Sequence, residues 1–144
     1  MHYVTREHIH VDRTATAWAI RRFVDPGATF GFVPRSVELN AIDGIPFDLR
    51  GAELGHRRGR CTLEALIEKY ELADDGLRRM AAIIRGADLP HEDSIPPEAP
   101  GVLAIFTGIR DSSTTDEERL ERGSVVCEAL YAYCVQTSEA GARS

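Results

Sequence analysis

The amino-terminal part of the chain carries the pattern that most limits the fold, because it predicts a strand, a helix and a second strand in succession. Polar and apolar residues alternate from Val4 to Val11, as in a half-buried strand. Residues 13–25 show helical spacing up to a Pro-Gly pair, and residues 28–34 form a second short apolar segment. Two strands joined through a helix lie parallel, with a right-handed crossover. We therefore expect a parallel sheet.

The end of the predicted first strand is where this fold would bind a ligand. In open α/β sheets, ligands bind beyond the carboxyl ends of the strands. Asp12 and Arg13 follow the strand directly, so both are candidate site residues. Alternation also places His8 and His10 on one strand face with Asp12. That histidine pair either ligates zinc or faces solvent, and the spacing leaves both interpretations open.

The rest of the chain predicts four further helices, after a turn-rich segment that holds one short extended piece at residues 45–49. We therefore expect a helix-rich α/β fold, in which a small parallel sheet from the amino-terminal unit is packed by these four helices. Residues 1–136 would form this single domain, and residues 137–144 a disordered tail. The helical spacing covers residues 63–70, 74–88, 96–109 and 113–136.

Sequence signals also predict how the last helices begin and pack. Gly86 is a natural helix end, which would place Asp88 just outside the helix. Thr114 and Glu117 have the spacing of a capping box. Cys127 and Cys134 fall on the apolar stripe of the last helix, so we expect both thiols in the core.

Charge and composition exclude several classes of function. A chain of 144 residues with a formal net charge of -6 fits one domain and does not attract nucleic acid or anionic lipid at long range. There is no apolar run long enough for a membrane span, and the three cysteines form no C-x-x-C pair, so we expect a cytoplasmic protein in a reducing compartment. Lys69 is the only lysine among 17 basic residues, which disfavours Schiff-base chemistry and leaves arginine, a bidentate anion binder.

The segment from Gly51 to Glu64 concentrates chemically active side chains between two glycine turns. Glu53 and His56 are three residues apart, so one helical turn would place carboxylate and imidazole side by side. Such a pair suits a metal ion or a proton transfer, but it also occurs as a plain surface hydrogen bond. A third ligand must come from a distant segment. Asp88 is our candidate, with Asp12 or Glu64 as further possibilities.

Cys61 is the third chemically active residue of this segment. It follows several arginines and precedes a helix, and both features lower the pKa of a thiol. The residue is therefore either a reactive thiolate or simply a small residue before a helix. The sequence favours neither.

Five short motifs give the chain a family resemblance. V-D-R, P-F-D, G-A-E-x-x-H, C-T-x-E and R-G-A-D occur in this order between about Val4 and about Cys134. With them the chain resembles the chromate-resistance protein family, the domain that forms the carboxy-terminal part of ChrB-type proteins. The resemblance implies a link to chromate operons and chromate-responsive regulation, without a defined chemistry. It emphasises Asp12, Arg13, Trp18, Arg22, Phe23, Asp25, Phe47, Asp48, Glu53, His56, Cys61, Glu64, Arg85, Gly86 and Asp88.

The chain departs from the family pattern in two ways. The helix after V-D-R usually carries Cys-Pro-Trp-Leu, where this chain has residues 16–19 as Thr-Ala-Trp-Ala, so a thiol mechanism at that position is excluded. The amino-terminal DNA-binding part of the regulators has no counterpart here. We therefore expect no direct binding of nucleic acid by this chain, and a homo-oligomer stays an open possibility.

Two functions of different class follow from these features. The first is a small metal-dependent enzyme acting on an anionic small molecule, with a divalent iron, manganese or zinc ion. The second is a binding module that senses chromate or another oxyanion without turnover. A third, plainer interpretation is a structural domain with surface salt bridges. We favour the enzyme, because Glu53 beside the arginines would repel an anion unless its carboxylate were paired or bound to a metal. The expected metal ligands are Glu53, His56 and Asp88, the anion-binding residues Arg13, Arg22 and Arg85, and the catalytic residues Asp12, Arg13, His56 and Cys61.

Overall fold

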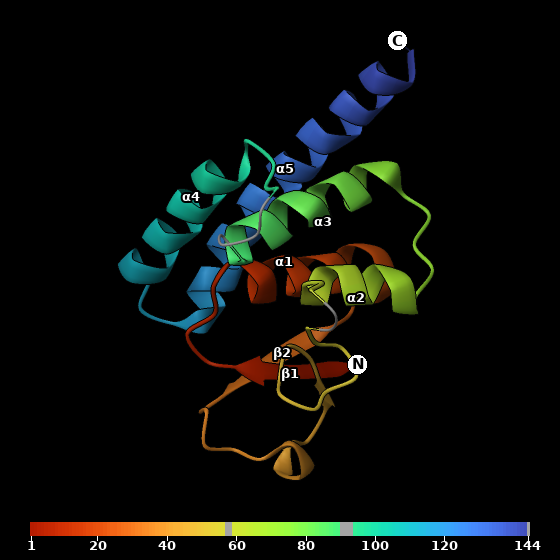
Figure 1. The fold of residues 1–144 in the computed structure, drawn as a ribbon. Coiled ribbons are helices and arrows are strands. Elements are labelled where there is room, and N and C mark those ends of the chain that lie inside the picture. Colours follow the sequence, from red (N-terminus) through yellow and green to blue (C-terminus); the bar gives the residue numbers. More distant parts are fainter. Residues whose placement is uncertain (57–58, 90–93, 144) are drawn as a thin grey trace.

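The sheet is small, parallel and three-stranded. The computed structural model describes residues 1–56, 59–89 and 94–143, and within them the strand order is β2-β1-β3 (Figure 1). β1 pairs in parallel with both neighbours. The strands are β1 (His2–Arg6), β2 (Thr29–Val33) and β3 (Ile45–Pro46).

The helices account for most of the chain, and in Figure 1 the five α-helices lie on one side of the sheet, with α1 and α2 nearest to it. α1 and a π-helical turn, η1, connect β1 to β2, which is the strand–helix–strand unit that the sequence predicts. The expected helix-rich α/β fold is thereby confirmed. The helical elements are α1 (Val11–Ala19), η1 (Ile20–Val24), the 3-10 turn η2 (Leu39–Ala41), α2 (Thr62–Lys69), α3 (Asp75–Asp88), α4 (Ala99–Ser112) and α5 (Asp116–Arg143).

The first strand is shorter than the alternation of residues predicts. β1 ends at Arg6, and the backbone at His8 is left-handed, with φ 61. The N–H groups of His8 and Ile9 donate to the two carboxylate oxygens of Asp116, each at 2.9 Å. A distant side chain thus binds the donors that a longer strand would use. Asp12 consequently lies in the first turn of α1 and not at a strand end.

Gly86 serves close packing, which corrects its expected role as a helix end. α3 continues through Asp88, its last residue. A Cβ atom at Gly86 would lie 3.0 Å from the Cβ of Ala99 and 3.1 Å from Cδ of Pro96. Glycine therefore allows α3 to approach the start of α4, and Asp88 is the last residue of α3.

The boundaries of α5 also differ from expectation. The N–H of Glu118 donates to the Thr115 hydroxyl at 3.1 Å, and the Glu118 carboxylate accepts from the N–H of Thr114 at 3.1 Å. The cap is therefore shifted by one residue from the predicted Thr114 and Glu117. At the other end, α5 continues to Arg143 through the segment expected as a tail. None of the described helices is long and apolar enough to cross a bilayer.

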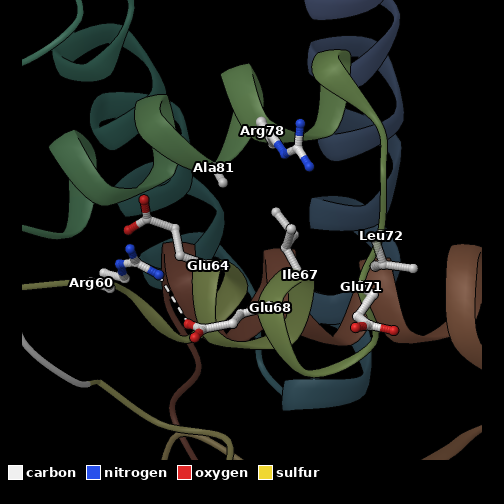
Figure 2. Close-up of a pocket in the computed structure, with 8 residues that line it drawn as sticks. All are labelled: Arg60, Glu64, Ile67, Glu68, Glu71, Leu72, Arg78 and Ala81. Carbon is white, nitrogen blue, oxygen red and sulfur yellow. Dashed lines mark hydrogen bonds and ion pairs between the residues drawn. The ribbon is translucent and has the colours of Figure 1, made fainter.

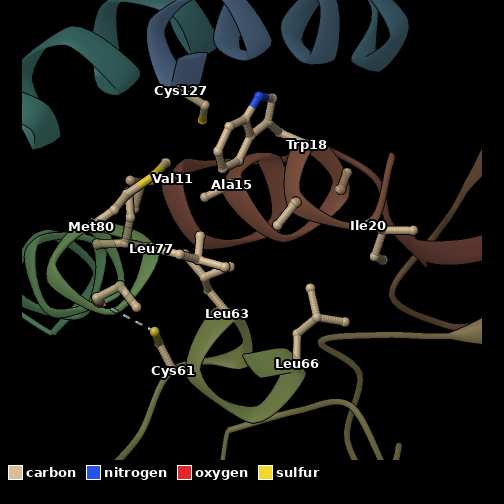
Figure 3. Packing of buried hydrophobic residues seen from close by; sticks show 14 of the residues in the cluster. Val11, Ala15, Trp18, Ile20, Cys61, Leu63, Leu66, Leu77, Met80 and Cys127 are labelled. Atoms are coloured by element: carbon tan, nitrogen blue, oxygen red, sulfur yellow. Dashed lines mark hydrogen bonds between the residues drawn. The ribbon is translucent and has the colours of Figure 1, made fainter. Parts of the chain in front are cut away.

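The core forms where α1 lies against α2, α3 and α5. Cys127 and Cys134 are both 0% exposed, so the prediction that the two thiols are buried is confirmed. Figure 3 shows these contacts, with Val11, Ala15 and Trp18 of α1 near Leu63 and Leu66 of α2, Leu77 and Met80 of α3, and Cys127 of α5.

Close contact between α1 and α5 makes Gly123 sensitive to substitution. A Cβ atom there would overlap the methyl group of Thr14 and lie 3.1 Å from Cε1 of Phe106. We expect Gly123→Ala to lower the free energy of unfolding by about 1–3 kcal/mol, as overpacking does. The control is Gly108→Ala in α4, where a Cβ meets nothing within 4 Å. The free energy of unfolding of Gly108→Ala should rise by up to about 1 kcal/mol, because alanine has a higher helix propensity than glycine. Urea denaturation measures both, and equal stabilities would contradict the predicted contact.

Candidate metal centre

Four side chains from three segments meet at the carboxyl edge of the sheet, with Asp48 and His56 both in the loop between β3 and α2. Asp12 follows β1, and Asp48 comes shortly after β3, which pairs in parallel with β1. Asp88 arrives at the end of α3. Their three carboxylates surround the imidazole of His56. We call Asp12, Asp48, His56 and Asp88 the His56 cluster.

Both ring nitrogens of His56 face carboxylates. Nδ1 lies 3.0 Å from Oδ1 of Asp48, and Nε2 lies 2.6 Å from Oδ2 of Asp88. Oδ2 of Asp12 is 3.4 Å from the same Nε2. The His56 side chain is 39% exposed, so one part of the ring still reaches solvent.

Asp12 has a structural role in addition to its place in the cluster. It is 1% exposed, and its carboxylate accepts the N–H groups of Thr62, at 2.9 Å, and Leu63, at 3.2 Å. These are free donors in the first turn of α2, so the side chain caps α2 from the start of α1. Burial and the charges of Asp48 and Asp88 raise the pKa of Asp12 to about 7.

Asp48 is held in an unusual backbone conformation. Its φ is 50, in the left-handed region that non-glycine residues rarely adopt. Its N–H donates to the Leu54 carbonyl at 2.6 Å, and its own carbonyl accepts from Nη2 of Arg13 at 3.2 Å. Nε of Arg13 is also 3.5 Å from the Asp48 carboxylate. The loop thus directs Asp48 between Arg13 and His56, and strained backbone of this kind concentrates at functional sites.

The surrounding carboxylates change the protonation of His56. Hydrogen bonds to Asp48 and then to Asp88 raise its pKa to about 10, against the opposing effect of burial. At neutral pH and without a metal, the imidazole is therefore a cation. It partly neutralises a cluster that carries three carboxylates.

This shift predicts how stability depends on pH in the metal-free protein. A raised folded-state pKa means that protonated His56 stabilises the fold fully below its ordinary value of 6.5, and that this contribution is lost as pH rises to about 10. We expect the free energy of unfolding to fall more steeply from pH 7 to 9.5 in the parent than in His56→Gln. Urea denaturation across this range measures the difference. If the free energy of unfolding depended on pH in the same way in the parent and in His56→Gln, folding would not raise the pKa of His56.

Glu53 lies away from the cluster. Its carboxylate contacts Nζ of Lys69 at 3.1 Å, and its side chain is 71% exposed. Residues 51–56 are not helical, because Phe47 and Leu54 pair as an isolated bridge within the loop. A spacing of three residues therefore does not bring Glu53 beside His56, as we expected, and the carboxylates nearest to the imidazole come from other segments.

The three arginines expected to bind an anion together are separated. Arg13 lies at the cluster, beside Asp48. Arg22 lies at the other end of the same helical segment, where its Nε is 3.3 Å from the carboxylate of Glu128. Nine residues of helix span about 13 Å. Nη1 of Arg85 donates to the Glu64 carboxylate at 3.0 Å. Each guanidinium thus interacts with a different carboxylate, and Arg22 is separated from Arg13 along the helix.

The structure decides against a reactive thiolate at Cys61. The residue is 0% exposed at the start of α2, where its N–H donates to Glu64 at 3.0 Å. Its Sγ lies 3.9 Å from the Ala81 carbonyl oxygen (Figure 3). Burial raises the pKa of the Cys61 thiol far above its ordinary range. The neighbouring arginines and the helix start therefore do not activate it, which removes Cys61 from the expected catalytic residues.

All three thiols are consequently expected to react slowly in the folded protein. Cys61, Cys127 and Cys134 are each 0% exposed, and burial raises the pKa of each. A thiol reagent at neutral pH should label all three rapidly in urea and none rapidly under native conditions. Rapid native labelling of Cys61 alone would restore the interpretation as a thiolate. Peptide mass spectrometry identifies the labelled residue.

His8 and His10 do not share a strand face. His8 is exposed, while His10 stands at the N-cap of α1 with Nε2 3.3 Å from the Thr107 hydroxyl. The expected alternation fails here because β1 ends before both residues.

A pocket of about 500 Å³ opens beside the cluster. His56 and Asp48 line it together with Arg6, Arg13 and Arg50. Figure 2 shows a second pocket, of about 550 Å³, between α2 and α3. There, Arg60 and Glu68 pair with each other at 2.9 Å.

Fold and site together define a small helix-rich α/β domain with a histidine–carboxylate cluster at the carboxyl edge of a parallel sheet. The chain belongs to the family described as ChrB, C-terminal domain, which matches residues 3–134. This confirms the resemblance to the chromate-resistance family. The chain is 35% identical over 132 residues to Protein ChrB of Cupriavidus metallidurans, an alignment that covers 91% of this chain and 40% of that protein. The chain thus spans about two fifths of the length of this relative. No solved structure matches.

Proposed function

We propose that this domain is a metal-dependent enzyme that binds a divalent transition metal at the His56 cluster and acts on an anionic small molecule. One observation carries the proposal. Asp12, Asp48 and His56 each offer one ligand atom, and these atoms lie within 4.8 Å of one another. Imidazole nitrogen and carboxylate oxygen are ligands that suit iron, manganese and zinc.

The charge balance of the cluster supports a cation and not an anion as its occupant. Burial raises the pKa of Asp12 most, and the charges of Asp48 and Asp88 raise it further, because the carboxylates repel one another. In the metal-free protein the proton on His56 and the guanidinium of Arg13 offset this repulsion. A divalent cation would replace the proton of His56 and add positive charge.

The surroundings of His56 also fit a metal ligand. A histidine that ligates through one nitrogen usually donates its other N–H to a carboxylate, which fixes the ring. In this cluster a carboxylate faces each nitrogen, so Asp48 or Asp88 would orient the ring while the other nitrogen binds metal. The ion would supply Lewis acidity or an activated water. Arg13, held against Asp48, would orient the anionic substrate.

The same geometry bears on the oxyanion-sensing alternative. An anion bound jointly by Arg13, Arg22 and Arg85 would need three guanidiniums that point to one place. Each of them interacts with its own carboxylate, on Asp48, Glu128 or Glu64 respectively. We therefore favour the metal-dependent function.

Metal titration of protein purified without an affinity tag tests the proposal. We expect one equivalent of manganese, iron or zinc to bind to the metal-depleted protein, with proton release near neutral pH because His56 must lose its proton. Calorimetry in buffers of different ionisation enthalpy measures both quantities. Failure of all three metals to bind at micromolar concentration would refute the proposal.

A further inference from the structure

We infer that the pocket beside His56 is the substrate subsite and takes an organic anion, that is, a phosphate ester or a carboxylate with an attached carbon body. This inference rests on the proposed function, since it names the substrate class of the same site. The pocket has a volume of about 500 Å³, and its wall includes His56 and Asp48 of the cluster.

The charge of the pocket is opposite to that of the cluster behind it. Among the described residues that line the pocket, three carry guanidiniums (Arg6, Arg13 and Arg50) and one, Asp48, carries a carboxylate. Asp12 is buried and caps α2. An anion in the pocket would therefore meet a positive wall, while a metal ion would meet the carboxylates. The arginine-lined pocket and the carboxylates of the His56 cluster together suit a metal ion with an anionic substrate beside it.

The arginines reach the pocket from three separate segments. Arg6 is the last residue of β1, Arg13 lies in the first turn of α1, and Arg50 belongs to the loop after β3. Nη1 of Arg6 donates to the carbonyl groups of Pro34 and Arg35, which holds its side chain in place. A guanidinium has five N–H donors, so these bonds leave donors for a ligand.

The size of the pocket distinguishes an organic anion from a bare oxyanion. Small-molecule pockets span about 300–1,000 Å³. The pocket, of about 500 Å³, lies within this range, whereas a tetrahedral oxyanion has only about five heavy atoms. Gly51, Ala52 and Gly55 on the wall have little or no side chain, so the body of a ligand can approach the backbone. A bare oxyanion would leave most of this space to water.

Calorimetric titration with three probes tests the inference on the full chain, with and without bound metal. The probes are inorganic phosphate, ribose 5-phosphate and malate. We expect ribose 5-phosphate or malate to bind at least tenfold more tightly than inorganic phosphate, and the better of the two identifies phosphate ester or carboxylate as the anionic group. Arg50→Gln should weaken that binding about tenfold, because Arg50 is exposed and contributes charge without supporting the core. Arg60→Gln, in the pocket between α2 and α3, is the matched control and should leave it unchanged.

The outcomes separate this inference from the proposed function. Equal or weaker binding of both organic anions relative to inorganic phosphate would overturn the subsite, and so would an Arg50→Gln variant that binds like the parent. If metal binds and neither organic anion does, the subsite fails while the metal site stands. If organic anions bind through Arg50 and no metal binds, the subsite stands and the metal-dependent function fails.

Discussion

A variant in which His56 is replaced by alanine is expected to lose metal affinity by more than about 100-fold. Removing a group that only orients a ligand costs about 10–100-fold. Among the residues that the structure describes, His56 is the sole nitrogen donor of the candidate centre, and it contacts all three carboxylates. Titration of manganese or zinc into metal-depleted parent and His56→Ala measures the change. The variant should remain folded, because the His56 side chain is partly exposed.

Glu53→Ala is the matched control for this experiment. Glu53 lies in the same loop, and the sequence alone assigns it as a ligand, but its carboxylate contacts Lys69 and is 71% exposed. We expect Glu53→Ala to bind metal as the parent does. Parent-like metal content in His56→Ala would refute the centre, and a large loss in Glu53→Ala would mean that the loop rearranges to bring Glu53 to the ion.

The second large effect concerns Asp12, whose two roles can be separated. Asp12→Ala leaves the N–H groups of Thr62 and Leu63 buried without their acceptor. We expect a loss of about 2–3 kcal/mol in the free energy of unfolding, from the missing cap and the unsatisfied donors. Asp12→Asn keeps one oxygen acceptor and removes the charge that Asp48 and Asp88 repel. Because Thr62 and Leu63 donate to different oxygens of Asp12, the stability of Asp12→Asn should lie between those of Asp12→Ala and the parent, while its metal affinity falls.

Urea denaturation of the metal-free proteins, followed by metal titration, tests this separation. If Asp12→Asn lost as much stability as Asp12→Ala, the one oxygen that asparagine retains would not be enough to cap α2. If Asp12→Asn bound metal like the parent, Asp12 would be a cap only. The remaining donors of the centre would then be Asp48, His56 and Asp88.

The elements of the fold could be predicted from the sequence because their signals are local. Apolar spacing marked all the main helices, and the strand–helix–strand unit placed Asp12 and Arg13 near the carboxyl edge of the sheet. The stripe on the last helix correctly predicted the burial of Cys127 and Cys134. Helix and strand periodicity depends on residues a few positions apart, so a single sequence contains it.

The composition of the site depended on contacts that periodicity does not encode. His56 was a candidate from the sequence, but its partners come from 8 and 32 residues away. Asp48 was emphasised only by the family resemblance, although its position near the end of the extended piece predicted at residues 45–49 was a signal for the sheet edge. Arg6 and Arg50 carried no local signal, because the loop must fold against β1 before they share a pocket.

Tertiary structure also overruled three local signals for a physical reason common to all. Asp116 binds the backbone donors that would lengthen β1, Ala99 packs where a side chain on Gly86 would lie, and the surrounding core buries Cys61. In each case a residue distant in sequence contributes a hydrogen bond or a contact that outweighs a local preference. Sequence by itself therefore determined which helices and strands form. Which side chains meet at the His56 cluster was decided only when those elements packed, because burial and hydrogen bonding act between segments far apart in the chain.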